Sequence, residues 1–329
     1  MQIADSHCDL LAYLLYDEGH QYDEVARCSV PQLKAGNVIF QTLAIYTNTS
    51  EESSSTSGYL QSELFKDLVE EETELRLINS AEDLEDLEES RQIGVMASIE
   101  NASGFCAEGE DIADGFKNLE AIIDNVGGRL LYISLTHHHK NRFGGGNYTR
   151  TGLKDDGCRL LDYLDGRGIA VDFSHTSDKL AYDILNYITT QNLDIPVMAS
   201  HSNLRTVHKH RRNLPTEIAQ EILERGGVIG FNWIKEFLGK NWGYYIKNIA
   251  TAFDTFGEDA AICMGTDFFH TPQLEDEEDS DFFEGYQTAA DYPTMVEALY
   301  ATNLFNEQQI ENFTKNNLLN FVEKVLVNY

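Results

Sequence analysis

Residues Ile169–His175 read IAVDFSH, and residues Pro196–His201 read PVMASH. Each segment is a short apolar run that ends in Ser-His, and the two histidines lie 26 residues apart. This spacing accommodates one strand, one helix and the next strand. We therefore expect two neighbouring parallel strands whose carboxyl ends bring His175 and His201 together.

Six further short apolar runs, rich in β-forming or small residues, occur along the chain. They are Ile3–Ala4, Phe40–Tyr46, Gly94–Ile99, Leu130–Leu135, Gly227–Phe231 and Ala261–Met264. Stretches with helical periodicity, such as Gly157–Gly166 and Thr216–Arg225, separate most of the runs. Eight buried strands that alternate with helices predict an α/β fold, a closed TIM-like (β/α)8 barrel. An open dinucleotide-binding sheet is disfavoured because no GxGxxG follows the first run.

No repeat, linker or change of composition divides the chain, so we expect one barrel domain over residues 1–329. The polar segment Glu51–Ser57 and the acidic run Gln273–Gly285 are expected to be loops. Between them, the acidic stretch Glu63–Glu89 carries leucines at helical spacing and predicts amphipathic helices.

The chain has 24 Lys and Arg against 55 Asp and Glu, which gives a formal net charge of −31. Such a surface repels phosphates and anionic lipids, so we expect neither a nucleic-acid nor a membrane partner. No window of eighteen apolar residues predicts a transmembrane helix, and residues 1–15 lack the basic start of a signal peptide. Five scattered cysteines without a CxxC are typical of reduced thiols, so we expect a cytoplasmic protein.

Groups that bind metals or transfer protons follow most of the expected strands. They are Asp5, His7 and Asp9 after the first run, then Glu100, His137, His175, His201 and Asp267. In a barrel the carboxyl ends of all strands meet on one face, where active sites lie. The sequence therefore predicts a site of several imidazoles and carboxylates at one mouth of the barrel.

Two features of this set indicate a metal centre. His7 and Asp9 are two positions apart, and in an extended strand such residues point to the same side, although a strand-end hydrogen bond also explains the pattern. Glu100 ends a nearly uncharged strand, where a buried carboxylate needs a partner. Imidazole and carboxylate ligands suit Zn²⁺, and two ions that share one carboxylate would generate a hydroxide and polarise a carbonyl.

The basic segment Lys209–Asn213 is rare in such an acidic chain and follows His201 closely. We expect one of its arginines to bind a substrate carboxylate, although surface salt bridges are the alternative. Cys8 is interpreted as a packing residue, with a nucleophilic role as the minority hypothesis. His138 and His139 are interpreted as solvent-facing residues or as residues behind the ligands.

Several segments resemble, in order, the motifs of the membrane (renal) dipeptidase family, the M19 metallopeptidases of the amidohydrolase-like barrels. They are Asp5–Leu10 (DSHCDL), Tyr132–His137 (YISLTH), Gly168–Ser177 (GIAVDFSHTS), Ala199–Pro215 (ASHSNLRTVHKHRRNLP), Gly227–Asn232 (GVIGFN) and Gly265–Phe268 (GTDF). The resemblance implies a zinc-dependent dipeptidase with two Zn²⁺ ions per chain. His7, Asp9 and Glu100 would hold one ion, and Glu100, His175 and His201 would hold the second.

The resemblance also implies roles for three further residues. His137 would contact the dipeptide and stabilise the tetrahedral intermediate, and Arg212 would bind the C-terminal carboxylate of the substrate. Asp267 would take the proton from the bridging water and pass it to the leaving amine. The chain departs from the family pattern at Thr266, where the family carries a second glycine before the aspartate. Family members often pair, so a homodimer is compatible with the resemblance.

Two other functions compete with this interpretation. Another amidohydrolase-type hydrolase, a deaminase or a lactonase acting on a small carboxylate-bearing substrate, would use the same scaffold. A catalytically inactive barrel that serves as an acidic binding protein is the third hypothesis. The complete set of ligand residues argues against the third, because buried charges are costly to retain without a function.

Overall fold

The computed structural model describes residues 1–271 and 280–328 of the chain. Within this part, nine strands form one parallel sheet: β1 Ile3–Cys8, β2 Val38–Tyr46, β3 Leu75–Leu77, β4 Ile93–Glu100, β5 Leu130–Ser134, β6 Ala170–Asp172, β7 Val197–Met198, β8 Ile229–Phe231 and β9 Ile262–Met264. Each of the eight predicted runs overlaps one of these strands. The predicted α/β barrel is therefore confirmed.

Eight of the strands make the wall of the barrel, in the order β7-β6-β5-β4-β2-β1-β9-β8. A parallel bridge between Ala199 and Ile229 joins the two ends of this order, after β7 and at the start of β8. A Cβ atom on Gly230 or Gly265 would lie 2.1 or 1.9 Å from the carbonyl oxygen of Ser200. The wall can therefore close tightly here only because both positions are glycine.

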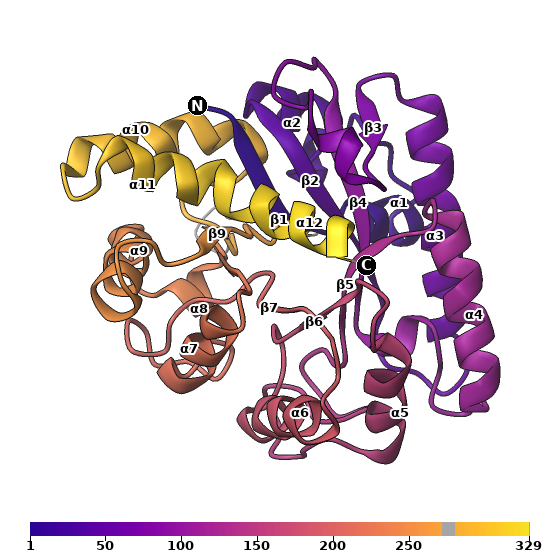
Figure 1. The fold of residues 1–329 in the computed structure, drawn as a ribbon. Helices are drawn as coiled ribbons and strands as arrows, with labels where there is room; N and C mark the ends of the chain where they lie inside the picture. The colour runs from indigo at the N-terminus through magenta and orange to yellow at the C-terminus, as the bar shows by residue number, and fades with distance from the viewer. Residues whose placement is uncertain (272–279, 329) are drawn as a thin grey trace.

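Helices surround the barrel and cover one of its ends (Figure 1). They are α1 Leu10–Tyr16, α2 Val30–Ala35, α3 Ser54–Glu71, α4 Ile112–Asn125, α5 Asp155–Leu164, α6 Asp178–Gln191, α7 Thr216–Glu224, α8 Lys235–Leu238, α9 Gly243–Phe256, α10 Tyr292–Thr302, α11 Glu307–Glu311 and α12 Asn317–Asn328. A π-helical segment, Asn312–Asn316, joins α11 to α12. The helical periodicity in Gly157–Gly166 and Thr216–Arg225 corresponds to α5 and α7.

The strand pleat separates an outer from an inner apolar layer. On β4, Val95, Ala97 and Ile99 pack into the large cluster beneath the helices, whereas Met96 belongs to the cluster inside the barrel. The inner cluster also receives apolar side chains from α12, which packs across β1 and β9. Those side chains are Leu318, Phe321, Val322, Val325 and Leu326. They close the amino-terminal end of the barrel, which we call the floor.

A layer of small polar side chains lies between the floor and the opposite end of the barrel, the mouth. Ser134 and Ser200 each donate a hydrogen bond of 2.7 Å to Asp172 Oδ2. Ser6 donates to the carbonyl oxygens of Ser200 and Met264, at 2.5 and 2.8 Å. All of these side chains are buried, so the layer satisfies its polar groups internally and supports the residues above it.

Three expectations outside the barrel wall had different outcomes. The segment Glu51–Ser57 is not wholly a loop, because α3 begins at Ser54, which is buried. The stretch Glu63–Glu89 is not helical throughout, since Leu75 and Leu77 lie in β3, which pairs with β4. The error arises because a three-residue strand is too short for its spacing of apolar residues to separate a strand from a helix. Most of the acidic run Gln273–Gly285 lies outside the described residues.

Candidate metal centre

The predicted site residues converge at the mouth of the barrel. His7 lies near the end of β1 and Glu100 ends β4, while His137, His175, His201 and Asp267 occupy the turns that follow β5, β6, β7 and β9. Asp9 precedes the first residue of α1, so it approaches His7 from a helix start and not from the extended strand that the spacing suggested. All seven residues lie together at the mouth, as the sequence predicted. Asp9 reaches this place from the start of α1, however, and not from an extended strand.

Glu100 is at the centre of the cluster, and its two carboxylate oxygens face different partners. Oε2 lies 3.3 Å from His7 Nε2. Oε1 lies 2.9 Å from His175 Nε2 and 3.4 Å from His201 Nε2. The donor atoms of His7, Asp9 and Glu100 form one compact group, and those of Glu100, His175 and His201 form another. One carboxylate is therefore shared by two sets of metal-binding groups.

Several buried polar atoms in the cluster lack a hydrogen-bond partner among the described residues. They include His7 Nε2 and Asp9 Oδ1, whose separation is 3.8 Å. Leaving such atoms unpaired inside a protein costs free energy, so they are rarely without a purpose. Nitrogen and oxygen donors that converge without satisfying one another fit a divalent cation such as zinc.

Two of the imidazoles are oriented from behind, as metal-binding histidines usually are. His7 Nδ1 lies 2.6 Å from the hydroxyl of Tyr132, which donates in turn to the carbonyl oxygen of Ser6. His201 Nδ1 lies 2.6 Å from Ser200 Oγ. In each case the contact fixes the ring and leaves Nε2 directed at Glu100. Tyr132 was not predicted, and strand alternation could not have found it, because the adjacent Leu131 and Tyr132 both lie in the cluster inside the barrel.

The two sides of the cluster have opposite protonation tendencies. Burial lowers the pKa of His175 and His201 well below the usual histidine value, so both rings are neutral. Burial also disfavours protonation of His7, but its neighbours Tyr132, Glu100 and Asp9 outweigh this effect and raise its pKa well above the usual value. Burial raises the pKa of Glu100, against the opposing effect of His7.

Asp267 faces the same space from the β9 side, with Oδ1 3.5 Å from His7 Nε2. Burial raises its pKa well above the usual aspartate value. Both Asp267 and His175 have left-handed backbone conformations, with φ of 63° and 64°. Such conformations are uncommon for residues other than glycine and accumulate at functional sites, where the surrounding structure enforces them.

Arg212 lies behind the wall of the mouth pocket, as His7 and His201 do. It is 2% exposed and donates from Nη1 to Ser202 Oγ at 2.5 Å and from Nη2 to the carbonyl oxygen of His201 at 2.8 Å. Its Nε has no hydrogen-bond partner among the described residues. The guanidinium carbon lies 5.7 Å from the ring centre of Phe237, which lines the pocket. Arg212 therefore supports His201 directly and approaches the pocket beside Phe237.

The pocket at the mouth has a mixed lining. The cluster contributes Asp9, Glu100, His137, His175 and Asp267. Apolar and aromatic side chains also line it, among them Tyr13, Tyr16, Ile234, Phe237 and Phe269, together with the ionisable residues Asp17, Glu236, His270 and Asp281. The pocket therefore offers a small organic molecule both apolar surface and polar or ionisable groups.

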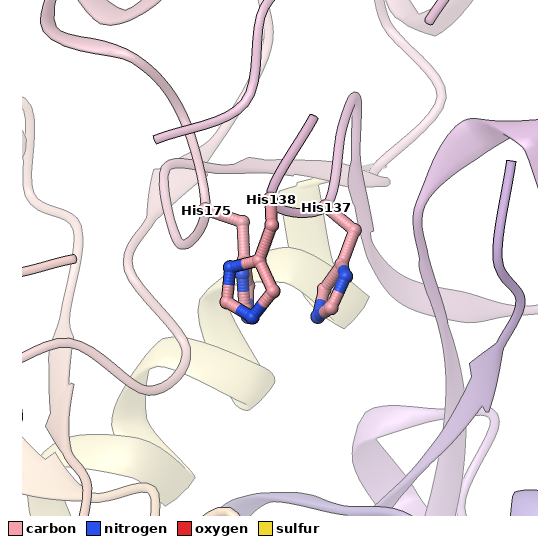
Figure 2. Close-up of side chains that lie close together, drawn as sticks. All are labelled: His137, His138 and His175. Atoms are coloured by element: carbon pink, nitrogen blue, oxygen red, sulfur yellow. The ribbon is translucent and has the colours of Figure 1, made fainter. Parts of the chain in front are cut away.

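His138, which was interpreted as a solvent-facing residue or as a residue behind the ligands, also lines this pocket. Figure 2 shows its ring beside those of His137 and His175. The ring centres of His137 and His138 are 4.0 Å apart. His137, His138 and His139 are consecutive, so the sequence pattern could not predict that His138 lines the pocket while His139 is exposed.

A closed parallel barrel with imidazoles and carboxylates at the carboxyl ends of its strands defines a TIM barrel of the metal-dependent amidohydrolase type. A family model for the membrane dipeptidases (peptidase family M19) matches residues 1–327, so the chain belongs to this family. The family comprises metallo-dipeptidases, and the chain is accordingly a member of a hydrolase family.

The relatives agree with this assignment. The chain is 24% identical to dipeptidase 3 of Macaca fascicularis over 332 residues, which cover 96% of the chain and 64% of that protein. Four curated relatives match it over 46% to 72% of their own lengths. Among the described residues, no helix has both the length and the apolar character needed to cross a bilayer.

Two solved structures share the fold. The crystal structure of a dipeptidase of family M19 superimposes with a TM-score of 0.82 at 19% identity, covering 99% of both chains. A metallopeptidase from Rhodobacter sphaeroides, liganded with a phosphinate mimic of the dipeptide L-Ala-D-Ala, has a TM-score of 0.79 at 19% identity over 99% of both chains. At this identity the comparison establishes the common architecture.

Proposed function

We propose that the protein hydrolyses dipeptides with two zinc ions bound at the mouth of the barrel. His7, Asp9 and Glu100 would hold one ion, and Glu100, His175 and His201 the other. The observation that carries this proposal is the division of Glu100, whose oxygens face His7 on one side and the His175–His201 pair on the other. A pair of ions held in this way would supply an ionised water near neutral pH and polarise the scissile carbonyl.

The protein's own groups would position and protonate the substrate. His137 lies with Nε2 3.8 Å from Glu100 Oε1, and burial keeps its pKa well below the usual value. A neutral imidazole at this place can donate a hydrogen bond to the oxyanion that develops on the carbonyl oxygen. Asp267 would accept the proton of the attacking water and deliver it to the departing amine, and its raised pKa favours such a shuttle.

Arg212 would bind the terminal carboxylate of the dipeptide. The unpaired Nε and the position beside Phe237 support this role, because a buried guanidinium without a carboxylate partner has unused donors. A charged anchor at a fixed distance from the cluster would favour dipeptides over longer peptides. The apolar and aromatic residues that line the pocket would receive a side chain of the substrate.

The decisive experiment compares matched substrates on protein that has been stripped of metal and then reloaded with zinc. We expect cleavage of free dipeptides only by the reloaded protein, with two zinc ions per chain by metal analysis. Dipeptides whose C-terminus is amidated should be cleaved about 10- to 100-fold less efficiently, because the charge-assisted hydrogen bonds to Arg212 are lost. Equal activity after chelation would contradict the proposal, and equal cleavage of amides would remove the role of Arg212.

A parallel screen of lactones and of amino-substituted heterocycles tests the deaminase and lactonase alternatives. Activity confined to those substrates would replace the dipeptidase proposal while leaving the metal centre intact.

A further inference from the structure

Three imidazoles meet at one side of the mouth pocket, on the turns that follow β5 and β6. His137, His138 and His175 each offer a ring nitrogen, and the three donor atoms lie within 4.8 Å of one another. The ring centres of His138 and His175 are 4.8 Å apart, and those of His137 and His175 are 4.2 Å apart (Figure 2). Three nitrogen ligands at such spacing can surround a single ion.

The orientation of His138 is fixed by its neighbours. Its Nδ1 lies 3.0 Å from Asn147 Oδ1, and its ring stacks on Tyr148 with the centres 4.8 Å apart. Because an amide oxygen only accepts, the Nδ1 atom carries the proton and the Nε2 atom keeps its lone pair. Asn147 is itself anchored, since its backbone N–H donates to the carbonyl oxygen of His175 at 2.8 Å. His138 is therefore held in the manner of a metal-binding histidine.

His175 has a nitrogen that the two-ion centre does not use. Its Nε2 faces Glu100 and His201, at 2.9 Å from each. Its Nδ1 is buried and has no hydrogen-bond partner among the described residues, unlike Nδ1 of His7 and of His201. A buried ring nitrogen that meets neither an acceptor nor a donor is a group for which a ligand is expected.

We propose that His137, His138 and His175 form a further site, which binds a transition-metal ion of the zinc class and inhibits the enzyme. His138 and His137 would bind this ion as neutral imidazoles, whereas His175, whose Nε2 faces the two-ion centre, would bind it through Nδ1 and release the Nδ1 proton to solvent. Because of this proton loss, the site binds a cation more weakly than the two groups that contain Glu100 and fills only when metal is in excess. All three residues line the pocket, which gives an ion access from solvent. The inhibitory part rests on the proposed dipeptidase function, because the ion would occupy His137 and obstruct the substrate.

The site is tested by equilibrium dialysis against increasing free Zn²⁺, with bound zinc counted by metal analysis. The variants are His138→Ala and His138→Gln, with His139→Ala as the matched control because His139 is adjacent, exposed and outside the group. We expect the wild type and His139→Ala to bind one more ion per chain at high zinc than either His138 variant. Equal stoichiometry in the wild type and in a folded His138 variant would overturn the site.

Inhibition gives a second and separate reading. Activity toward a dipeptide is measured at rising zinc and expressed relative to the activity of each variant without excess metal. We expect the His138 variants to need at least about tenfold more zinc for half inhibition than the wild type or His139→Ala, because the further ion loses one of its three ligands. Superimposable curves would overturn the inhibitory role. The dialysis result does not depend on any substrate, so failure of the dipeptidase proposal and failure of this site are distinguishable.

Discussion

The floor and the mouth of the barrel are built by the same strands, yet they have opposite chemistry. At the floor, Ala4, Phe40, Met96 and Met198 meet the apolar face of α12. The mouth lies a few residues further along these segments or in the turns that follow them. There, buried carboxylates and imidazoles face one another, and several of their polar atoms have no hydrogen-bond partner among the described residues. Removal of apolar surface from water at the floor stabilises the folded protein, whereas removal of charged groups from water at the mouth destabilises it.

This difference separates stability from function along the barrel axis. The floor tolerates no cavity because its packing supplies the free energy of folding. The mouth tolerates strain at His175 and Asp267 because the floor and the polar layer hold the strands in place. Substitutions at the two ends are therefore expected to affect different measurements.

The largest effect is expected for Glu100→Gln, which keeps the size of the shared side chain but removes its charge. We expect loss of zinc from the centre and a decrease in kcat/KM of about 10³-fold, equivalent to about 4 kcal/mol of transition-state stabilisation. The metal-free variant should be at least as stable to heat as the metal-free wild type, because a costly buried carboxylate is gone. Glu297→Gln on the exposed face of α10 is the control. Normal zinc content in Glu100→Gln would refute the two-sided centre.

At the floor, Phe321→Ala should act on stability alone. The side chain is buried in the inner cluster, and its removal is expected to reduce the free energy of unfolding by about 3–5 kcal/mol. The variant Val327→Ala lies on the same helix at 63% exposure and should change it by less than about 0.5 kcal/mol. Chemical denaturation measures both. We expect folded, zinc-loaded Phe321→Ala to keep the kcat of the wild type. A clear decrease in its kcat would show that the two ends of the barrel are not separate.

Tyr132→Phe sharpens the comparison, because Tyr132 packs in the floor cluster while its hydroxyl reaches His7. We expect zinc affinity to fall by about 10- to 100-fold, since the ring of His7 loses the partner that orients it. The measurement is competition with a chelator of known affinity. Tyr245→Phe on α9, an equally buried tyrosine, serves as the control and should leave zinc affinity unchanged. An unaltered affinity in Tyr132→Phe would restrict Tyr132 to packing.

The last prediction concerns pH and requires no substitution. Without metal, the raised pKa of His7 keeps this proposed ligand protonated above the usual histidine range, so zinc must displace its proton. Zinc affinity should therefore rise between pH 6 and pH 8, by about tenfold per pH unit for each proton displaced. His175 and His201, with lowered pKa values, add nothing to this slope. Chelator competition at several pH values provides the test, and an affinity independent of pH would contradict these protonation states.

Much of the site follows from the sequence because it depends on strand order and strand ends. Apolar runs mark the strands, and in a parallel barrel every strand presents its carboxyl end to the same mouth. His175 and His201 could thus be assigned as neighbours from their spacing alone. Arg212 was correctly expected near His201, but its depth behind Phe237 was not foreseeable from a basic cluster.

Other features depend on contacts that no local pattern encodes. The pairing of β1 with β2 is irregular between Asp5 and Cys8, which lets the adjacent Ser6 and His7 both contact groups inside the barrel. A strict alternation would have placed them on opposite faces. The short strand β3 was missed for a related reason, since three residues give too little periodicity to separate a strand from a helix.

The amino-acid sequence by itself determined the barrel, its eight strand segments and the identity of the groups at its mouth, because these depend on periodicity and on the order of segments along the chain. The tertiary structure decided how Glu100 divides its oxygens, which partners hold His7 and His201, and that His138 joins His137 and His175. These relations join residues that are distant in the chain, and their geometry is set by the closure and twist of the whole sheet.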